Sequence, residues 1–333
     1  IRPRRTFIMP NYQGVWSLSE QYQNRTGWPA PPFGAAAVIM GGYVNGFTTT
    51  NQITRVSIES LGAEEDFGTL LGNYYRTTGT FGSTVRAFVG GGRNGGLLNT
   101  IQFVTFASGG SATDFGDRTV TAQNVYSVNS DTRGVMAYDS YGGGNILDYI
   151  TMASAGNAID FGDLVTGGNA VGNSCSPTRG LFSYFTTNYS ATTIDYITTA
   201  STGNASTFGN LASTDAASSS GFSSNTRGIV KSGGVNPSAS NAAVNTIEYV
   251  TIATTGNAAD FGDLSYAGGW YPAATSNKVR GVTMGGRDLA TSVSYANMDY
   301  VTIATTGNGT DFGDLNQTLT TAGAAGDANG GLS

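Results

Sequence analysis

The sequence predicts an all-β fold in which six small sheets form a propeller, preceded by an extended N-terminal arm. Three observations predict it. A sixfold repeat with a period of about 50 residues runs through most of the chain, and such periods are typical of solenoids, propellers and arrays. Each repeat contains alternating, β-branched runs that favour strands. The 49 glycines and 8 prolines among 333 residues suit short strands joined by tight turns.

Composition also limits the functions that we expect. Charged residues make up 11% of the chain and the net charge is −6, so no broad basic face for nucleic acid is expected. Histidine is absent, which removes the commonest general base and neutral metal ligand. The single cysteine, Cys175, excludes an internal disulfide. No apolar run approaches the ~20 residues of a membrane-spanning helix, and no apolar signal-peptide core is present, so we expect no membrane insertion.

The first 32 residues carry no copy of the repeat and are rich in Arg, Trp and Pro. We expect an extended arm over residues 1–32 and the propeller over residues 33–333. Arginine and aromatic side chains often anchor interfaces, so the arm is a candidate docking segment for another protein. The alternative is a linker from a preceding region. The candidate docking residues are Arg4, Arg5, Trp16 and Trp28.

Each repeat contains the same succession of short segments. An Arg-Gly-led apolar run, such as RGVMAY at 133–138, is followed by an alternating run, such as IEYVTIAT at 247–254. A Gly-Asn pair, typical of a tight turn, then precedes an Asp-Phe-Gly-Asp tetrapeptide and a stretch of small residues. These segments predict three to four strands per unit, which is the strand count of a propeller blade.

The Asp-Phe-Gly-Asp tetrapeptides allow a structural and a chemical interpretation. We expect each Phe to plug the space between neighbouring units. The paired carboxylates could bind a metal, but Ca²⁺ requires six to eight oxygen ligands and the spacing does not follow that of an EF-hand loop. We favour a structural role, in which the first Asp caps the turn and the second pairs with an Arg. The acids are Asp114, Asp117, Asp160, Asp163, Asp260, Asp263, Asp311 and Asp314.

The arginines that open the apolar runs recur at a fixed phase of the repeat. They could bind an anion in a central channel, but repetition favours a scaffold role. We expect each guanidinium to fork onto an Asp or onto turn carbonyls of an adjacent blade. One hypothesis is a ring of ion pairs with the Asp-Phe-Gly-Asp acids. The residues are Arg86, Arg133, Arg179, Arg227 and Arg280.

The two ends of the repeat region are complementary. The first apolar run, at 33–42, lacks both its Arg and a preceding strand, whereas the chain continues beyond the last tetrapeptide into small residues. We therefore expect the C-terminal strand, within residues 317–333, to complete the first blade and close a six-bladed ring.

Aromatic residues that interrupt the repeat are the candidate ligand-binding residues, because irregular loops of repeat proteins often form binding faces. Exposed Tyr and Trp supply rigid contact area and stack on sugars. The alternative is packing between blades. The candidates are Tyr74, Tyr75, Tyr126, Trp270 and Tyr271.

Residues 245–286, NTIEYVTIATTGNAADFGDL … VRGVTMGG, resemble the kelch-like β-propeller repeats of tail-fibre and other virion proteins of tailed phages, especially those of marine and cyanobacterial hosts. Residues 33–333 resemble them more loosely. The resemblance implies a structural protein on the surface of the phage particle. Its expected partners are other virion proteins, in a homo-oligomer or larger assembly, and a host-surface glycan or receptor. No cofactor is expected.

Three functions remain open on this basis. We favour a non-enzymatic component that recognises host-surface glycans through propeller loops. One alternative is an architectural capsid or tail decoration protein without a receptor role. The other is a glycan-cleaving tail enzyme, which needs two carboxylates about 5–10 Å apart in a cleft. Acids outside the repeated motifs are few and no pair stands out.

Overall fold

The chain divides into two units, residues 1–32 and 33–333. The computed structural model describes residues 36–60, 64–138, 144–185, 192–213, 220–231, 233 and 243–328, all in the second unit. The predicted docking residues Arg4, Arg5, Trp16 and Trp28 lie outside the described residues. The described residues form strands and turns without a helix, so they include no helix long and apolar enough to cross a membrane.

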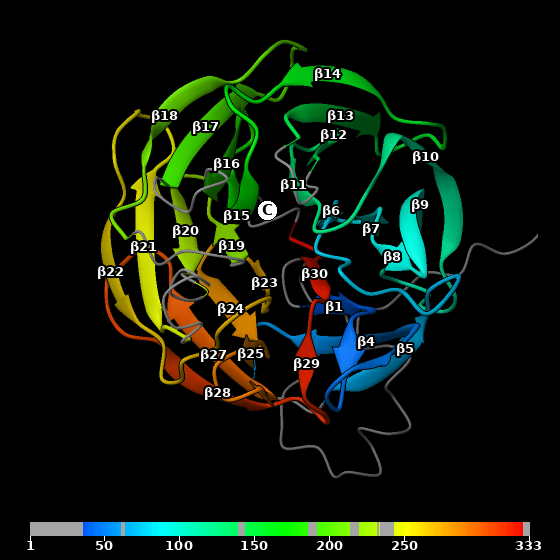
Figure 1. Ribbon diagram of the computed structural model, residues 1–333, viewed down its shortest axis with the longest axis vertical. Helices are drawn as coiled ribbons and strands as arrows, with labels where there is room; N and C mark the ends of the chain where they lie inside the picture. The colour runs from blue at the N-terminus through cyan, green and yellow to red at the C-terminus, as the bar shows by residue number, and fades with distance from the viewer. Residues whose placement is uncertain are drawn as a thin grey trace, which may run out of the picture. The chain divides into compact units, whose positions relative to one another are not determined.

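Six small antiparallel sheets make up most of the described chain (Figure 1). The first two sheets, in spatial order, are β30 (Gly323–Gly326), β1 (Ala36–Met40), β4 (Gln52–Ser57) and β5 (Glu65–Thr69); and β6 (Thr80–Gly82), β7 (Arg86–Gly90), β9 (Gly96–Thr105) and β10 (Thr113–Ala122). The third and fourth are β11 (Tyr126–Asn129), β12 (Arg133–Ala137), β13 (Ile146–Thr151) and β14 (Ile159–Asp163); and β15 (Asn169–Cys175), β16 (Arg179–Phe185), β17 (Thr192–Thr198) and β18 (Ser206–Asn210). The fifth and sixth are β19 (Ser220–Ser223), β20 (Arg227–Lys231), β21 (Thr246–Thr251) and β22 (Ala259–Asp263); and β23 (Ala273–Ser276), β24 (Arg280–Met284), β27 (Asn297–Thr302) and β28 (Thr310–Asp314).

Shorter strands occupy the connections at one end of these sheets. β2 (Tyr43–Val44) pairs with β3 (Thr48–Thr49) and with β29 (Leu319–Thr320). β25 (Arg287–Asp288) pairs with β26 (Val293–Ser294), and β8 (Arg93–Asn94) pairs with β9. The β2–β29 pairing ties the connection within the first sheet to the segment that follows the sixth.

Each segment of the repeat has a fixed place in its sheet. The small-residue stretch forms the first strand, the Arg-led run the second, the alternating run the third and the tetrapeptide the fourth. The Phe of the tetrapeptide is a bulged residue: in the third sheet, Asp148 pairs with Asp160 and Leu147 with Gly162, which leaves Phe161 out of register. A bulge redirects the side chain at that position, and here the Phe side chain is buried against the next sheet.

The hydrophobic core of the described residues consists of six clusters, and each draws its residues from two sheets. Phe161 of the third sheet packs with Phe182 and Ile197 of the fourth, as the sequence predicts for the Phe plugs. One cluster joins sheets that are distant in the chain: Phe312 of the sixth sheet packs with Ile39 and Ile58 of the first. The other pairs of neighbouring sheets are joined in the same way.

Backbone hydrogen bonds join the outer strands of neighbouring sheets. The Gly203 nitrogen donates to the Phe161 oxygen at 2.7 Å, and the Asp163 nitrogen donates to the Asn204 side chain at 3.1 Å. At the corresponding seam of the next two sheets, a Cβ added to Gly209 would lie 2.1 Å from the Gly256 oxygen. The tetrapeptide glycine therefore allows the backbone of the following Gly-Asn pair to approach closely.

The two ends of the described chain lie in one sheet. β30 pairs with β1 in the register Ala37–Gly326 to Met40–Gly323, so part of the C-terminal tail completes the first sheet. The first strands also contact one another in succession, β6 with β11, β15, β19, β23, β30 and again β6. The described part of the protein is thus all-β, with small antiparallel sheets in a propeller-like arrangement (Figure 1).

Candidate functional site

The repeated arginines link each sheet to the next. The Arg133 guanidinium lies 4.7 Å from the ring centroid of Tyr149 in its own sheet and donates to the oxygens of Thr199 and Ala200 in the next, at 3.2 and 2.9 Å. The other four arginines make the same kind of contact. The expected fork onto turn carbonyls is therefore present, and the proposed ring of ion pairs with the Asp residues is wrong. These five guanidinium groups are Arg86, Arg133, Arg179, Arg227 and Arg280.

The repeated acids lie at the outer edge of the sheets. The Asp114 carboxylate accepts from the Gly116 nitrogen at 3.2 Å, and Asp311 accepts from Gly313 at 2.9 Å, so in these two copies the first acid caps the bulge. The second acid forms no ion pair among the described residues, where Arg118–Asp148 is the one that occurs; the expected pairing of the second Asp with Arg is wrong. No cluster of three or more Asp, Glu or Cys side chains in the described residues could hold a metal.

A second set of acids, which the sequence analysis missed, is buried within the third strands. Asp148, Asp195, Glu248 and Asp299 are at most 2% exposed. Each accepts a backbone hydrogen bond from the segment that leaves the preceding sheet; Asp195, for example, accepts from the Val165 nitrogen at 2.8 Å. Burial raises the pKa of Asp195, Glu248 and Asp299, and these hydrogen bonds oppose the rise. An aromatic residue follows each of them, but one also follows the first acid of each tetrapeptide, so the sequence does not separate the two sets.

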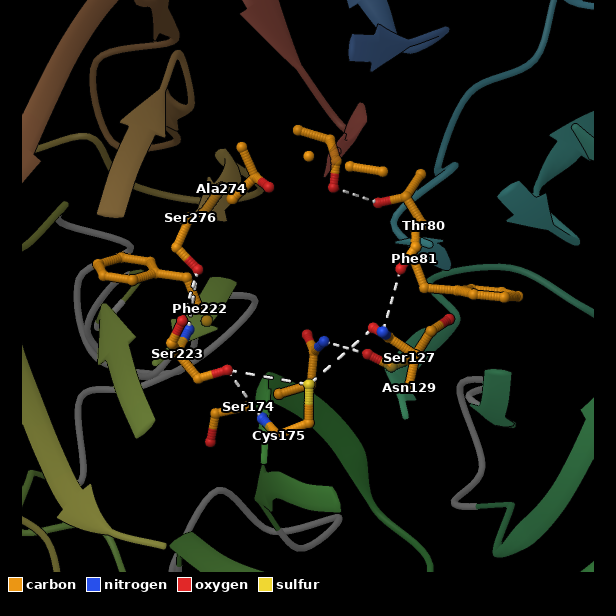
Figure 2. A pocket seen from close by; sticks show the side chains of 17 residues that line it. Thr80, Phe81, Ser127, Asn129, Ser174, Cys175, Phe222, Ser223, Ala274 and Ser276 are labelled. Atoms are coloured by element: carbon orange, nitrogen blue, oxygen red, sulfur yellow. Dashed lines mark hydrogen bonds between the residues drawn. The ribbon is translucent and has the colours of Figure 1, made fainter. Parts of the chain in front are cut away.

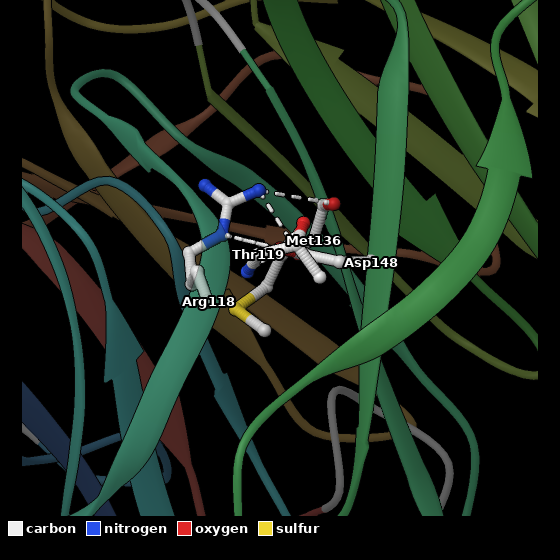
Figure 3. A network of polar contacts seen from close by, with 4 residues as sticks. All are labelled: Arg118, Thr119, Met136 and Asp148. Carbon is white, nitrogen blue, oxygen red and sulfur yellow. Dashed lines mark hydrogen bonds and ion pairs between the residues drawn. The ribbon is translucent and has the colours of Figure 1, made fainter.

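One of these acids forms the buried ion pair (Figure 3). The Arg118 Nε and Nη2 atoms donate to Asp148 Oδ1 at 3.1 and 3.0 Å, and both side chains are fully buried. Arg118 Nη2 also donates to the Met136 oxygen, and the Thr119 nitrogen and hydroxyl donate to Asp148 Oδ2. This network joins the second sheet to the third and leaves the pair without access to a substrate.

A narrow polar channel lies between the first strands of the six sheets (Figure 2). The Asn129 amide donates to the Gly82 oxygen, the Cys175 nitrogen to the Ser223 hydroxyl, and the Ser276 hydroxyl to the Ser223 oxygen. The cavity has a volume of about 40 Å³. That volume suits a few water molecules and is too small for a sugar ring.

Cys175 is part of this channel wall, and its thiol has low reactivity. It is buried, and burial raises the pKa of its thiol. Its sulfur donates to the Asn129 oxygen at 3.9 Å and accepts from the Ser223 hydroxyl at 3.8 Å. A neutral, enclosed thiol is a poor nucleophile.

The predicted aromatic candidates separate into two groups. Tyr74, Tyr126 and Trp270 are 9%, 3% and 3% exposed and belong to the hydrophobic clusters between sheets. The expectation that they form an exposed binding surface is therefore wrong, and the alternative of packing between blades describes them. Tyr75 and Tyr271 are half-buried and reach the surface.

Tyr75 and Tyr271 belong to a continuous surface cluster, which we call the arginine–aromatic patch. Its members come from the connections beyond the second strands of the first, second and sixth sheets and beyond the fourth strands of the first and fifth sheets. These connections lie at the end of the sheets opposite the five repeated arginines. The patch comprises Tyr43, Phe47, Tyr75, Arg76, Arg93, Tyr271 and Arg287.

The patch is built around a row of three aromatic rings. The Tyr43 ring lies 4.6 Å from Tyr75 and 5.5 Å from Phe47, between centroids. The Arg287 guanidinium lies 4.1 Å from the Phe47 centroid, and the Arg76 guanidinium lies 5.9 Å from the Tyr271 centroid. Backbone bridges connect Tyr75 with Arg93 and Trp270 with Arg287, which fixes the loops relative to one another.

No protein-family model matches the chain, and no curated protein matches it. The chemistry of the patch is therefore inferred from its residues. Half-exposed rings offer flat faces for stacking, and arginines offer planar groups of donors for anions or hydroxyls. These are groups for binding rather than for proton transfer.

Proposed function

We propose that the protein is a non-enzymatic surface component of a phage virion that recognises a host-surface glycan through its loops. The resemblance of its repeats to kelch-like virion propellers motivates the virion assignment. The observation that carries the recognition role is the arginine–aromatic patch, because it joins stacking rings and hydrogen-bond donors on one surface.

The fold that we propose for this role is a six-bladed propeller closed by the C-terminal strand. The pairing of β30 with β1 and the cluster around Phe312 support closure. A hydrogen bond that is local in the other sheets, but joins the two ends of the described chain in the first sheet, supports closure further. In the other sheets, a Ser or Asn accepts from the nitrogen of the repeated Arg, as Ser130 does from Arg133; in the first sheet, Asp327 accepts from Ala36 at 3.1 Å.

The buried carboxylates support a non-enzymatic role. Asp148, Asp195, Glu248 and Asp299 each accept hydrogen bonds from backbone groups of another sheet, which explains their presence as structural. A glycan-cleaving enzyme would need a pair of carboxyl groups facing a cleft.

An architectural role without receptor binding is the second candidate. The arginine contacts from one sheet to the next and the backbone seams favour it, because they make a rigid body suited to decorating a particle. Loss of such a protein would weaken particles while leaving adsorption to host cells unchanged.

Binding of the full chain to bacterial surface polysaccharides tests the proposal. We expect binding of intact polysaccharide without the appearance of new reducing ends, and labelling of phage particles by antibodies against the chain. New reducing ends would indicate an enzyme. Labelled particles together with no binding to any polysaccharide would favour the architectural role.

A further inference from the structure

Two arginines of the patch have no carboxylate partner. In the described part of the chain, Arg93 Nη1 donates to the Gln123 side chain at 3.3 Å and Arg287 Nη1 donates to the Ser294 hydroxyl at 3.4 Å, and both partners are neutral. The Nε atoms of Arg93 and Arg287 are buried and have no hydrogen-bond partner among the described residues. Such donors are costly to bury unless an acceptor meets them.

The nearest acid in the sequence does not neutralise this charge. Asp288 follows Arg287, but its carboxylate accepts from the Ala290 nitrogen at 2.9 Å and from the Thr291 hydroxyl at 2.8 Å. The side chain of Arg287 is 7% exposed and lies under Phe47, which is 67% exposed. A positive charge thus lies directly beneath an exposed aromatic ring.

The opposite end of the aromatic row is also positive. Burial and a hydrogen bond with Tyr75 raise the pKa of the Tyr43 hydroxyl, whereas the charges of Arg76 and Arg93 act to lower it. Both guanidinium groups therefore lie close to the Tyr43–Tyr75 end of the row. Guanidinium groups at both ends of a row of rings match a stacked ligand that carries negative charge.

Backbone strain is concentrated in the same place. Arg76 and Tyr271 have φ angles of 57° and 58°, in the left-handed region that non-glycine residues rarely occupy. Residues held in such conformations cluster at ligand-binding sites, where the surrounding structure maintains the strain. Arg76 and Tyr271 are thus two patch members that the surrounding structure holds in strained conformations.

We propose that the arginine–aromatic patch binds an acidic saccharide. This inference rests on the proposed function and specifies the glycan as one that carries carboxylate or sulfate groups. The rings of Tyr75 and Phe47 stack on sugar faces, and Arg76 and Arg93 receive the anionic groups. Arg287 adds positive charge beneath Phe47.

Titration calorimetry of the full chain with dextran, dextran sulfate and polygalacturonate tests this proposal, because the first two polymers share a backbone and differ in charge. We expect an affinity at least tenfold higher for an acidic polymer than for dextran. Arg93→Gln and Arg76→Gln should each weaken binding about tenfold, as expected for the loss of one charge-assisted hydrogen bond. Arg55→Gln is the matched control, because Arg55 lies on β4 outside the patch.

The outcomes separate this inference from the proposed function. Binding of neutral host polysaccharide that Arg93→Gln leaves unchanged would overturn the acidic-saccharide site and leave glycan recognition intact. Equal weakening by Arg55→Gln, or tighter binding of duplex DNA than of either acidic polymer, would also overturn it. Failure to bind any saccharide would overturn both. Unchanged melting temperatures of the variants show that a loss of binding is not a loss of folding.

Discussion

Lys231 is an ionisable residue whose amine is buried in the protein interior. Its side chain is fully buried, its amine donates to the Gly269 oxygen at 2.8 Å, and burial lowers its pKa from 10.5 to about 7. Between these two values the unfolded chain binds a proton that the folded chain does not. Stability therefore rises with pH through this window, by about 1.4 kcal/mol per unit at most.

Replacement of this amine by a neutral side chain should remove this contribution to the pH dependence of stability. We expect Lys231→Met to stabilise the protein most at or below pH 7, where the charge is buried, and progressively less towards pH 10. Denaturant unfolding across this range measures the difference. Lys278→Met is the control, because Lys278 is exposed. An advantage of Lys231→Met that grows with pH would contradict the account.

Two glycines at one seam provide a test of close backbone approach. A Cβ at Gly209 would lie 2.1 Å from the Gly256 oxygen, whereas a Cβ at Gly256 would meet nothing within 4 Å, and neither residue has a positive φ. We expect Gly209→Ala to destabilise the protein by about 1–3 kcal/mol through overpacking. Gly256→Ala should be close to neutral. Similar unfolding midpoints for the two variants would refute the steric role of Gly209.

At the scale of elements, the bulges and the buried acids determine how the sheets join. In the third sheet the bulge turns Phe161 towards the fourth, and Asp148 fixes the segment that enters from the second. The same two devices recur with Phe261 and Asp299. The third sheet is thus contacted by the second through its third strand, and it contacts the fourth through its own fourth strand.

The buried pair Arg118–Asp148 tests this joint. Arg118→Met should destabilise the protein by about 3–5 kcal/mol, because Asp148 would remain buried as an unpaired charge. Adding Asp148→Asn should recover much of this loss, since a neutral amide is cheaper to bury. Urea unfolding of both variants and of Asp148→Asn alone gives the coupling free energy between the two side chains. A double variant no more stable than Arg118→Met would show that the charge is not the cause.

The order of elements could be predicted from the sequence, because the repeat marks equivalent positions. The Arg-led, alternating and Asp-Phe-Gly-Asp segments occupy the second, third and fourth strands as expected. The buried acids could not be recognised, because Asp148 differs from Asp160 only in its surroundings. The partners of the arginines could not be chosen either, since carbonyls of the next sheet carry no signature in the sequence. Tyr75 was found, but Tyr43 and Arg287 belong to the patch through pairings that only the folded chain creates.

At the scale of the whole molecule, the junction of the chain ends is the place where the repeat is incomplete. Ala36 stands where the other sheets have Arg, so no side chain from this position reaches the next sheet. The Asp327 carboxylate accepts a hydrogen bond from the Ala36 nitrogen, and the backbone nitrogen of Asp327 donates to the Ala36 oxygen at 3.0 Å. These bonds hold together segments that are 291 residues apart.

Removal of this acceptor should loosen the junction selectively. We expect Asp327→Ala to cost about 1–2 kcal/mol, as for the loss of a buried hydrogen bond to a charged group. Amide hydrogen exchange should speed up first in residues 36–40 and 323–326. Asp327→Asn keeps an acceptor oxygen and should retain most of the protection. Uniform acceleration across all six sheets would argue against a local seam.

The antiparallel pairing of β1 and β30 also has a mechanical consequence. Ala36 enters and Asp327 leaves at the same end of the pair, so a force pulling the two termini apart acts at one edge of the ladder. The strands would peel away one hydrogen bond at a time instead of sliding past each other with all bonds loaded together. Tension between the termini would therefore open the molecule at this sheet first, while the other five sheets stayed folded.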